Sequence, residues 1–237
     1  MRKSLIVIFA VVAGALLLSG CSTSTIMTNP ELAKADYSQR TLAIYPTHSH
    51  DIVVKNPDDV RDDYADRRGA PEEIIASLLY SNGYNAVDDF YKKIQLQKIA
   101  RRDFYSPSMY PDKFFSVDLE VHDDSGVLTM KKFYAPTAEA MRSAGLTADV
   151  VLYFNHFETT KEFGKGPGSQ GYLAGYVDFI IWDYEQEKPV SWGSHRVVSS
   201  YMIACSELTW NNLIGLAMKE SFKNTNFLDN TRWQPIN

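Results

Sequence analysis

The chain has 237 residues, of which 45% are hydrophobic, 13% aromatic and 22% charged, a composition typical of a globular protein of one or two domains. Its formal net charge of −5 argues against a general nucleic-acid-binding protein, because such a protein needs a basic surface to displace counterions from phosphates. Two cysteines are too few for a disulfide-dense scaffold or a cysteine-rich zinc module.

The N-terminus has the pattern of a bacterial lipoprotein signal peptide. Two cations at positions 2 and 3 precede an apolar run over 5–18, which is too short to span a bilayer comfortably. The run ends in Leu18-Ser19-Gly20-Cys21, which resembles the lipobox, whose cysteine is lipidated after cleavage. We therefore predict a signal peptide over residues 1–20 and a lipid on Cys21.

The residues around the two cysteines predict where the protein lies. Stable membrane attachment needs more than one acyl chain, and lipoproteins of this kind carry enough of them. Ser22 follows the cysteine and, by resemblance to the enterobacterial sorting rule, favours the outer membrane, where we expect the domain on the periplasmic face. Because Cys21 carries lipid, Cys205 has no partner within the chain, and its apolar neighbours predict a buried, inert thiol.

Beyond the signal peptide, composition predicts a lipidated tether over 21–39, a single α+β domain over 40–225 and a polar tail over 226–237. Valines and a leucine that alternate with charged residues over 117–122 predict the first strand of a hairpin with one wet face. The expected order is strand 42–46, loop 48–68, helix from 71, strand 84–87, helix 88–102, hairpin 117–133, helix 136–145, strands 149–157, 172–184 and 190–203, and helix from 206.

This order resembles a known family of envelope lipoprotein domains, that of the curli exporter CsgG, the penicillin-binding-protein activator LpoB and the amino-terminal part of TolB. The segments that carry the resemblance are Leu42-Ala43-Ile44-Tyr45-Pro46, Asn82-Gly83-Tyr84-Asn85-Ala86-Val87, Gly145-Leu146-Thr147-Ala148-Asp149, Val177-Asp178-Phe179-Ile180-Ile181-Trp182-Asp183 and Pro189-Val190-Ser191-Trp192-Gly193. The resemblance implies a two-layer α/β sandwich with a mixed sheet and helices on one face. It also implies a non-enzymatic protein that works by contacting other proteins.

Three other patterns point to ligand chemistry, but each fits a solvated loop better. His48, His50 and the neighbouring Asp51 have side chains that bind zinc or copper, although a spacing of two on a loop arises often by chance. The acidic run over 58–66 lacks the spacing and glycine of a calcium loop. Glycines 166, 168 and 171 match the dinucleotide fingerprint by letter, but a strand is expected where that site needs a helix. We therefore predict no cofactor.

An aromatic-rich segment between 104 and 115 is the candidate protein-binding loop. Aromatic side chains serve as interface anchors, and they are buried in cores equally readily. The candidate contact residues are Phe104, Tyr105, Tyr110 and Phe114.

Two functions remain open on the sequence. The first is an outer-membrane lipoprotein that binds an envelope protein or a second copy of itself in cell-envelope or surface-structure assembly, without enzymatic activity. The alternative is a periplasmic small-ligand or metal-binding lipoprotein, or a hydrolase, with His48 and His50 in its site. The sequence favours the first, because it contains no Gly-x-Ser-x-Gly nucleophile elbow and no catalytic carboxylate pair.

Overall fold

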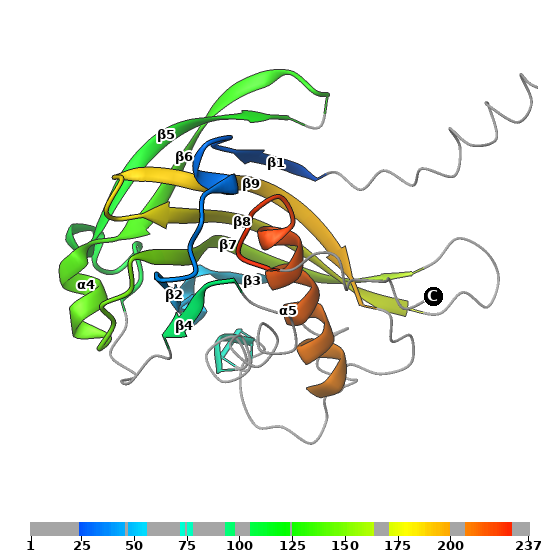
Figure 1. The fold of residues 1–237 in the computed structure, drawn as a ribbon. Coiled ribbons are helices and arrows are strands. Elements are labelled where there is room, and N and C mark those ends of the chain that lie inside the picture. The colour runs from blue at the N-terminus through cyan, green and yellow to red at the C-terminus, as the bar shows by residue number, and fades with distance from the viewer. Residues whose placement is uncertain are drawn as a thin grey trace, which may run out of the picture.

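The computed structural model describes residues 24–45, 47–55, 72–73, 75–77, 93–97, 105–123, 125–163, 171–199 and 207–228. The expected signal peptide, Cys21, Phe104, Cys205 and the acidic run over 58–66 lie outside these residues. In the described part the chain folds as a mixed α+β structure (Figure 1). Its elements are β1 Thr25–Thr28, η1 Leu32–Lys34, β2 Thr41–Tyr45, η2 Ser49–Asp51, β3 Ile52–Val54, β4 Gln95–Gln97, η4 Pro111–Lys113, β5 Phe114–His122, β6 Leu128–Pro136, α4 Ala138–Ser143, β7 Val150–Phe163, β8 Gly171–Asp183, β9 Lys188–Val198 and α5 Glu207–Phe222.

One mixed sheet dominates the structure. Its strand order is β1-β9-β8-β7-β2-β4, and β3 also pairs with β7 beyond the end of β2. Strands β2 and β3 run parallel to β7, whereas the pairs β7–β8, β8–β9 and β9–β1 are antiparallel. The predicted strands at 42–46, 149–157, 172–184 and 190–203 are confirmed as β2, β7, β8 and β9, and the helix from 206 as α5.

The central strands are buried on both faces. Residues 150–154 of β7 and 179–183 of β8 are all buried, without the alternation of a half-exposed strand. On one face, Trp210, Leu213 and Ala217 of α5 pack into a core that contains Phe179 and Ile181. On the other face, side chains of the β5–β6 hairpin pack with Ile180 and Trp182.

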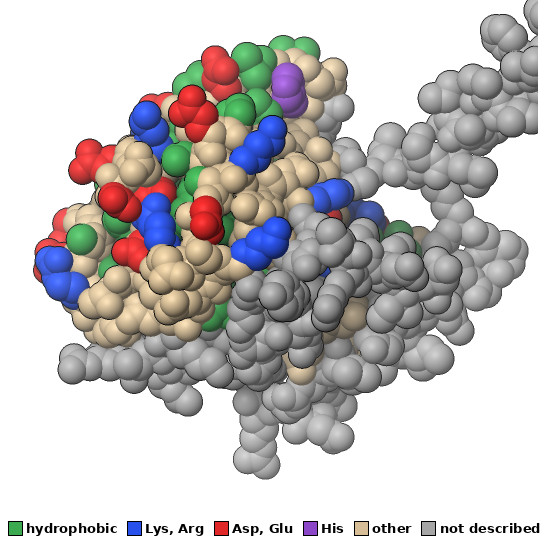
Figure 2. Space-filling view, in the orientation of Figure 1, with side chains coloured by type: hydrophobic (Ala, Val, Ile, Leu, Met, Phe, Trp, Pro, Cys, Tyr) green, Lys and Arg blue, Asp and Glu red, His purple; other side chains and the backbone are tan. Residues whose placement is uncertain are grey.

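The β5–β6 hairpin therefore covers the face that the sequence analysis leaves without helices. Its antiparallel register runs from Phe114 opposite Pro136 to His122 opposite Leu128. Val117, Leu119 and Val121 face the sheet, and the alternate positions of β5 are exposed, which confirms the predicted wet face. Charged side chains of both signs and hydrophobic side chains mix over the exposed surface in Figure 2.

The expectation that all helices lie on one face is wrong. Helix α4 contributes Ala140 and Met141 to the core beneath the hairpin, whereas α5 lies on the opposite face. Helix α4 follows β6 directly, with the Thr137 hydroxyl capping its first turn. Its apolar residues are therefore held on the side of the sheet that the hairpin already occupies.

The tether expected over 21–39 also differs from the structure. Strand β1 pairs with β9 at the edge of the sheet, and the Tyr37 side chain is buried. Strand β1 has only four residues, which would form no stable strand alone. Its order therefore comes from pairing with β9. Similarly, Phe227 at the start of the expected polar tail is buried against Tyr37, with ring centroids 4.7 Å apart.

Two further expectations are corrected. The loop expected over 48–68 contains strand β3, whose pairing partner β7 lies about a hundred residues further along the chain. Within the range 88–102, where a helix is expected, residues Gln95–Gln97 form strand β4. This strand pairs in parallel with β2. In both places the pairing partner is distant in sequence, so local pattern does not reveal it.

A buried carboxylate joins the N-terminal segment to the turn between β8 and β9. Asp183 is fully buried and accepts two hydrogen bonds from the Arg40 guanidinium, at 2.6 and 2.8 Å. Its Oδ1 also accepts from the backbone N–H groups of Glu185 and Gln186, both at 3.0 Å. Hydrogen bonding to Asp183 raises the pKa of Arg40, so the guanidinium is charged at neutral pH.

This pair supplies a stability test. Arg40→Ala leaves the Asp183 carboxylate buried without its counter-ion, so we expect a loss of about 3–5 kcal/mol in the free energy of unfolding. Urea denaturation followed by circular dichroism measures it. The control is Glu185→Ala, since the exposed Glu185 pairs with Arg40 more loosely, at 3.4 Å, and its loss should be small. Equal effects of the two changes would contradict the role assigned to Asp183.

Candidate interaction surface

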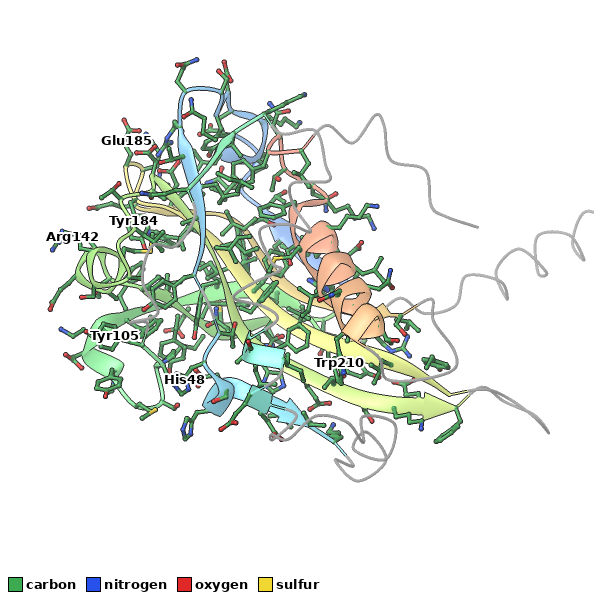
Figure 3. The ribbon with its side chains drawn as sticks, turned by 90° about the horizontal axis from the view of Figure 1, so that it is seen from below. His48, Tyr105, Arg142, Tyr184, Glu185 and Trp210 are labelled. Atoms are coloured by element: carbon green, nitrogen blue, oxygen red, sulfur yellow. The ribbon has the colours of Figure 1, made fainter. Side chains whose placement is uncertain are left out.

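The candidate surface is formed by residues 105–113, here called the aromatic loop, which include η4 and lead into β5. The Tyr105 ring meets the Tyr110 ring edge-on, with centroids 5.1 Å apart. The Lys113 ammonium lies 5.8 Å from the centre of the Tyr105 ring. Backbone N–H of Tyr105 donates to the Tyr45 hydroxyl at 2.9 Å, which fixes the start of the loop on β2. Figure 3 shows Tyr105 and His48 near one another at the same end of the molecule.

A single carboxylate fastens the loop to η2. Asp51 Oδ1 accepts hydrogen bonds from the hydroxyls of Ser106 and Ser108, both at 3.0 Å. The Ser106 side chain is fully buried, and its hydroxyl also accepts from the backbone N–H of Ser108. Because these bonds hold successive residues of the loop, its conformation is set before any partner binds.

Buried tyrosines form the floor beneath the loop. Burial raises the pKa of Tyr45 to about 12, and burial, followed by the nearby Asp51 charge, raises the pKa of Tyr153 well above its usual value. Both hydroxyls are therefore neutral at physiological pH and can act as hydrogen-bond donors. Neither hydroxyl ionises at that pH, and the Tyr45 hydroxyl supports the loop by accepting the hydrogen bond from Tyr105.

The predicted contact residues separate into two groups. Phe114 is buried and packs on Tyr45 and Tyr153, with ring centroids 5.9 and 5.4 Å away, so its assignment as a surface contact is wrong. It is the first residue of β5, and its ring completes a cluster with these two rings, which also contact each other. Tyr105 is half-buried, and Tyr110 is 44% exposed.

Sequence analysis missed Met109. Its side chain is 48% exposed beside Tyr110, between the two prolines of the loop. Methionine fills irregular apolar surfaces readily, and exposed methionine next to an aromatic residue is typical of binding surfaces. The aromatic loop thus presents two apolar side chains on a rigid support.

The two loop histidines stack on each other instead of converging on a common centre. Their ring centroids are 5.0 Å apart, and His48 Nδ1 accepts a hydrogen bond from the backbone N–H of His50 at 3.2 Å. Burial and the neighbouring His50 lower the pKa of His48. Within the described ranges, His, Cys, Asp and Glu side chains form no group of three or more that could hold a metal ion.

A histidine–serine pair lies in the core beneath α5. His195 Nε2 and Ser221 Oγ are 2.9 Å apart, and both side chains are buried. The Ser221 hydroxyl donates to the carbonyl of Ala217 at 2.9 Å, as helix serines commonly do. Burial lowers the pKa of His195 to about 3, so the imidazole is neutral in the folded protein. Asp178 extends from the opposite face of β8 and pairs with Lys131.

A shallow recess of about 400 Å³ lies near the end of β8. Trp182, Tyr184, Phe115 and Glu187 line it together with two residues at the start of α4. The Tyr184 hydroxyl donates to the Pro136 carbonyl at 2.6 Å, and burial raises its pKa. Tyr184, Glu185 and Arg142 lie at this end of the molecule in Figure 3.

The glycine-rich segment leads into a strand. Residues 164–170 lie outside the described part, and Gly171 begins β8, as the sequence predicted. No helix among the described residues is long and apolar enough to cross a membrane.

Comparisons with known proteins give distant structural similarity. No protein-family model and no curated protein sequence matches the chain. Twenty solved chains match. A PelC dodecamer from Paraburkholderia phytofirmans is 13% identical, with coverage of 83% of this chain and 97% of that one and a TM-score of 0.31. A homolog of a neuraminyllactose-binding hemagglutinin from Helicobacter pylori is 8% identical, covers 80% and 86%, and has a TM-score of 0.34. The hypothetical protein CT253 from Chlamydia trachomatis is 10% identical, covers 78% and 91%, and has a TM-score of 0.35.

The assignment of Phe114 to the core and of Tyr110 to the surface can be tested by measuring the free energy of unfolding of variants. Phe114→Ala removes a ring packed between two tyrosines, so we expect a loss of about 3–5 kcal/mol in the free energy of unfolding. Tyr110→Ala removes an exposed ring and should change that free energy by no more than about 0.5 kcal/mol. Urea denaturation of both variants measures the difference. A Tyr110→Ala variant as unstable as Phe114→Ala would place Tyr110 in the core.

Proposed function

We propose that the protein is a lipid-anchored outer-membrane lipoprotein that binds another envelope protein, or a second copy of itself, through the aromatic loop. The observation that carries this proposal is the rigid display of Met109 and Tyr110, held by the bonds from Asp51 to Ser106 and Ser108. A preformed loop loses little conformational entropy on binding, so its exposed apolar side chains can act as anchors.

The proposal extends to the family. The order of β2, β7, β8, β9 and α5 supports the resemblance to the CsgG, LpoB and TolB amino-terminal group, with α5 over one face of the sheet as its two-layer part. Members of that group work by contacting other proteins. The β5–β6 hairpin and α4 are then additions on the other face of the sheet.

Lipidation at Cys21 is tested by fractionation. The lipobox-like Leu18-Ser19-Gly20-Cys21 motivates the prediction that Cys21→Ala leaves an unprocessed precursor or a protein absent from the outer-membrane fraction. Radiolabelled palmitate incorporation and sucrose-gradient separation of membranes measure the two effects. The control is Cys205→Ala, which retains the lipobox and should be processed normally. Normal processing and membrane retention of Cys21→Ala would exclude the lipid anchor.

Binding through the aromatic loop is tested by site-specific photocrosslinking in intact cells. A photoreactive residue at position 110 should give a defined crosslinked species, either a dimer or a complex with one envelope protein. The control is position 163, because Phe163 is 60% exposed at the far end of β7. Identical crosslinked species from the two positions would argue against a specific surface.

The strength of the same contact is measurable once the species is identified. Tyr110→Ala should weaken binding by roughly 1–2 kcal/mol, a factor of about 5 to 30 in Kd, without loss of secondary structure. Sedimentation velocity measures self-association, and surface plasmon resonance measures a heterologous complex. Unchanged affinity in both measurements would place the interface elsewhere.

A further inference from the structure

Apolar side chains gather at the tip of the β5–β6 hairpin. Among the described residues, eight large hydrophobic side chains are exposed, and four of them belong to this hairpin. Val127, Leu128 and Met130 lie within four positions of one another and are 57%, 48% and 62% exposed. The space-filling view shows hydrophobic side chains grouped at its top, where the hairpin lies in Figure 1 (Figure 2). Grouped exposure of this kind marks a binding surface more often than scattered exposure does.

The register directs these side chains away from the protein. Side chains alternate between the two faces of a strand. Lys131 faces the main sheet, because its ammonium lies 2.7 Å from Asp178 and 3.1 Å from Ser194. Leu128 and Met130 lie at odd spacing from Lys131 and therefore face outwards, where they are 48% and 62% exposed.

The tip lies at the end of the molecule where the chain leads into β1. Trp192 is the register partner of Met27, and its indole N–H donates to the carbonyl of Glu120 at 2.8 Å. Ser194, which Lys131 contacts, is the register partner of Thr25. Beyond these contacts the end of the β5–β6 hairpin extends past β1, which is the edge strand of the sheet. It does so on the side from which β1 begins (Figure 1).

We infer that the hairpin tip inserts its apolar side chains into the lipid surface beside the acylated N-terminus, as a second membrane contact. The inference rests on the proposed lipid anchor. Cys21 precedes Thr25 by four residues, which span at most about 14 Å when fully extended. The start of β1 is therefore held close to the membrane, and the neighbouring tip faces the same surface.

The polar groups of the tip are compatible with the interfacial region of the bilayer. The Asp123 carboxylate accepts hydrogen bonds from the backbone N–H groups of Ser125 and Val127, both at 2.9 Å, and so closes the turn. Glu120 lies opposite Met130 and Asp118 lies opposite Lys132, both on the exposed face of β5. Because these acids would be repelled by anionic lipid, a zwitterionic surface is the appropriate probe.

The test measures the depth of single labelled positions. The mature lipoprotein with Cys205→Ala is reconstituted into vesicles of phosphatidylethanolamine and phosphatidylcholine, and an environment-sensitive fluorophore is attached at Met130→Cys or Leu128→Cys. The matched control is Tyr110→Cys, which carries an exposed residue at the opposite end of β5, about 30 Å away along the strand. Spin-labelled phosphatidylcholine in the vesicles quenches a fluorophore that lies in the membrane.

Quenching of at least about twofold at positions 128 and 130, with none at position 110, is the expected result, because interfacial apolar groups lie about 5–10 Å into the headgroup and acyl boundary. Equal quenching at all three positions, or none at 128 and 130, would overturn the inference while leaving the lipid anchor intact. Crosslinking of position 130 to a protein, with no quenching, would assign the tip to a protein partner and also overturn it. Failure of the unlabelled lipoprotein to float with the vesicles would instead exclude the lipid anchor, and the inference with it.

Discussion

The burial of β7 and β8 on both faces is the constraint from which the rest of the arrangement follows. Every residue over 150–154 and 179–183 is shielded from water, so apolar groups must cover each side of the sheet. Helix α5 covers one side and the β5–β6 hairpin, with α4, covers the other. The hairpin cannot detach without exposing Ile180 and Trp182, and the positions of both its ends depend on that packing.

The edge of the sheet is held by two contacts that leave little freedom. Gly193 has φ of 140°, and a Cβ there would lie 2.1 Å from the Thr25 carbonyl oxygen, so β1 approaches β9 more closely than any larger residue allows. Arg40 and Tyr37 follow shortly afterwards and meet the buried Asp183 carboxylate. These contacts fix the position of the N-terminal segment on the domain. Its first described strand, β1, lies next to the β5–β6 hairpin.

The hairpin places two different surfaces at its two ends. At one end the aromatic loop presents Met109 and Tyr110, and at the other the tip presents Leu128 and Met130. Nine residues of β5 separate them. If the tip meets the membrane as proposed, the aromatic loop is directed away from the lipid, towards the space in which the proposed partner would lie. A rigid two-stranded connection would then set the distance between anchor and partner.

The sequence by itself predicted the features that depend on local pattern. Alternation of apolar and charged residues over 117–122 located β5 and its wet face, and apolar runs located β2, β7, β8 and α5. Asp178 and Asp183 lie five positions apart on β8 and pair with Lys131 and Arg40 on opposite faces, as expected where side-chain direction repeats every two residues. For Tyr110 the sequence left surface contact and burial equally open, and the structure shows its side chain 44% exposed.

Only the tertiary structure decided which apolar residues are covered, because burial depends on partners that are distant along the chain. Phe114 and Tyr110 are equally aromatic in sequence, but Tyr45 and Tyr153 bury the first and leave the second exposed. Strands β1, β3 and β4 are only three or four residues long and are ordered by pairing with β9, β7 and β2, and the local pattern at these positions did not indicate a strand. Likewise, the β5–β6 hairpin lies on the face of the sheet that carries Ile180 and Trp182, because Val117, Leu119 and Val121 pack there.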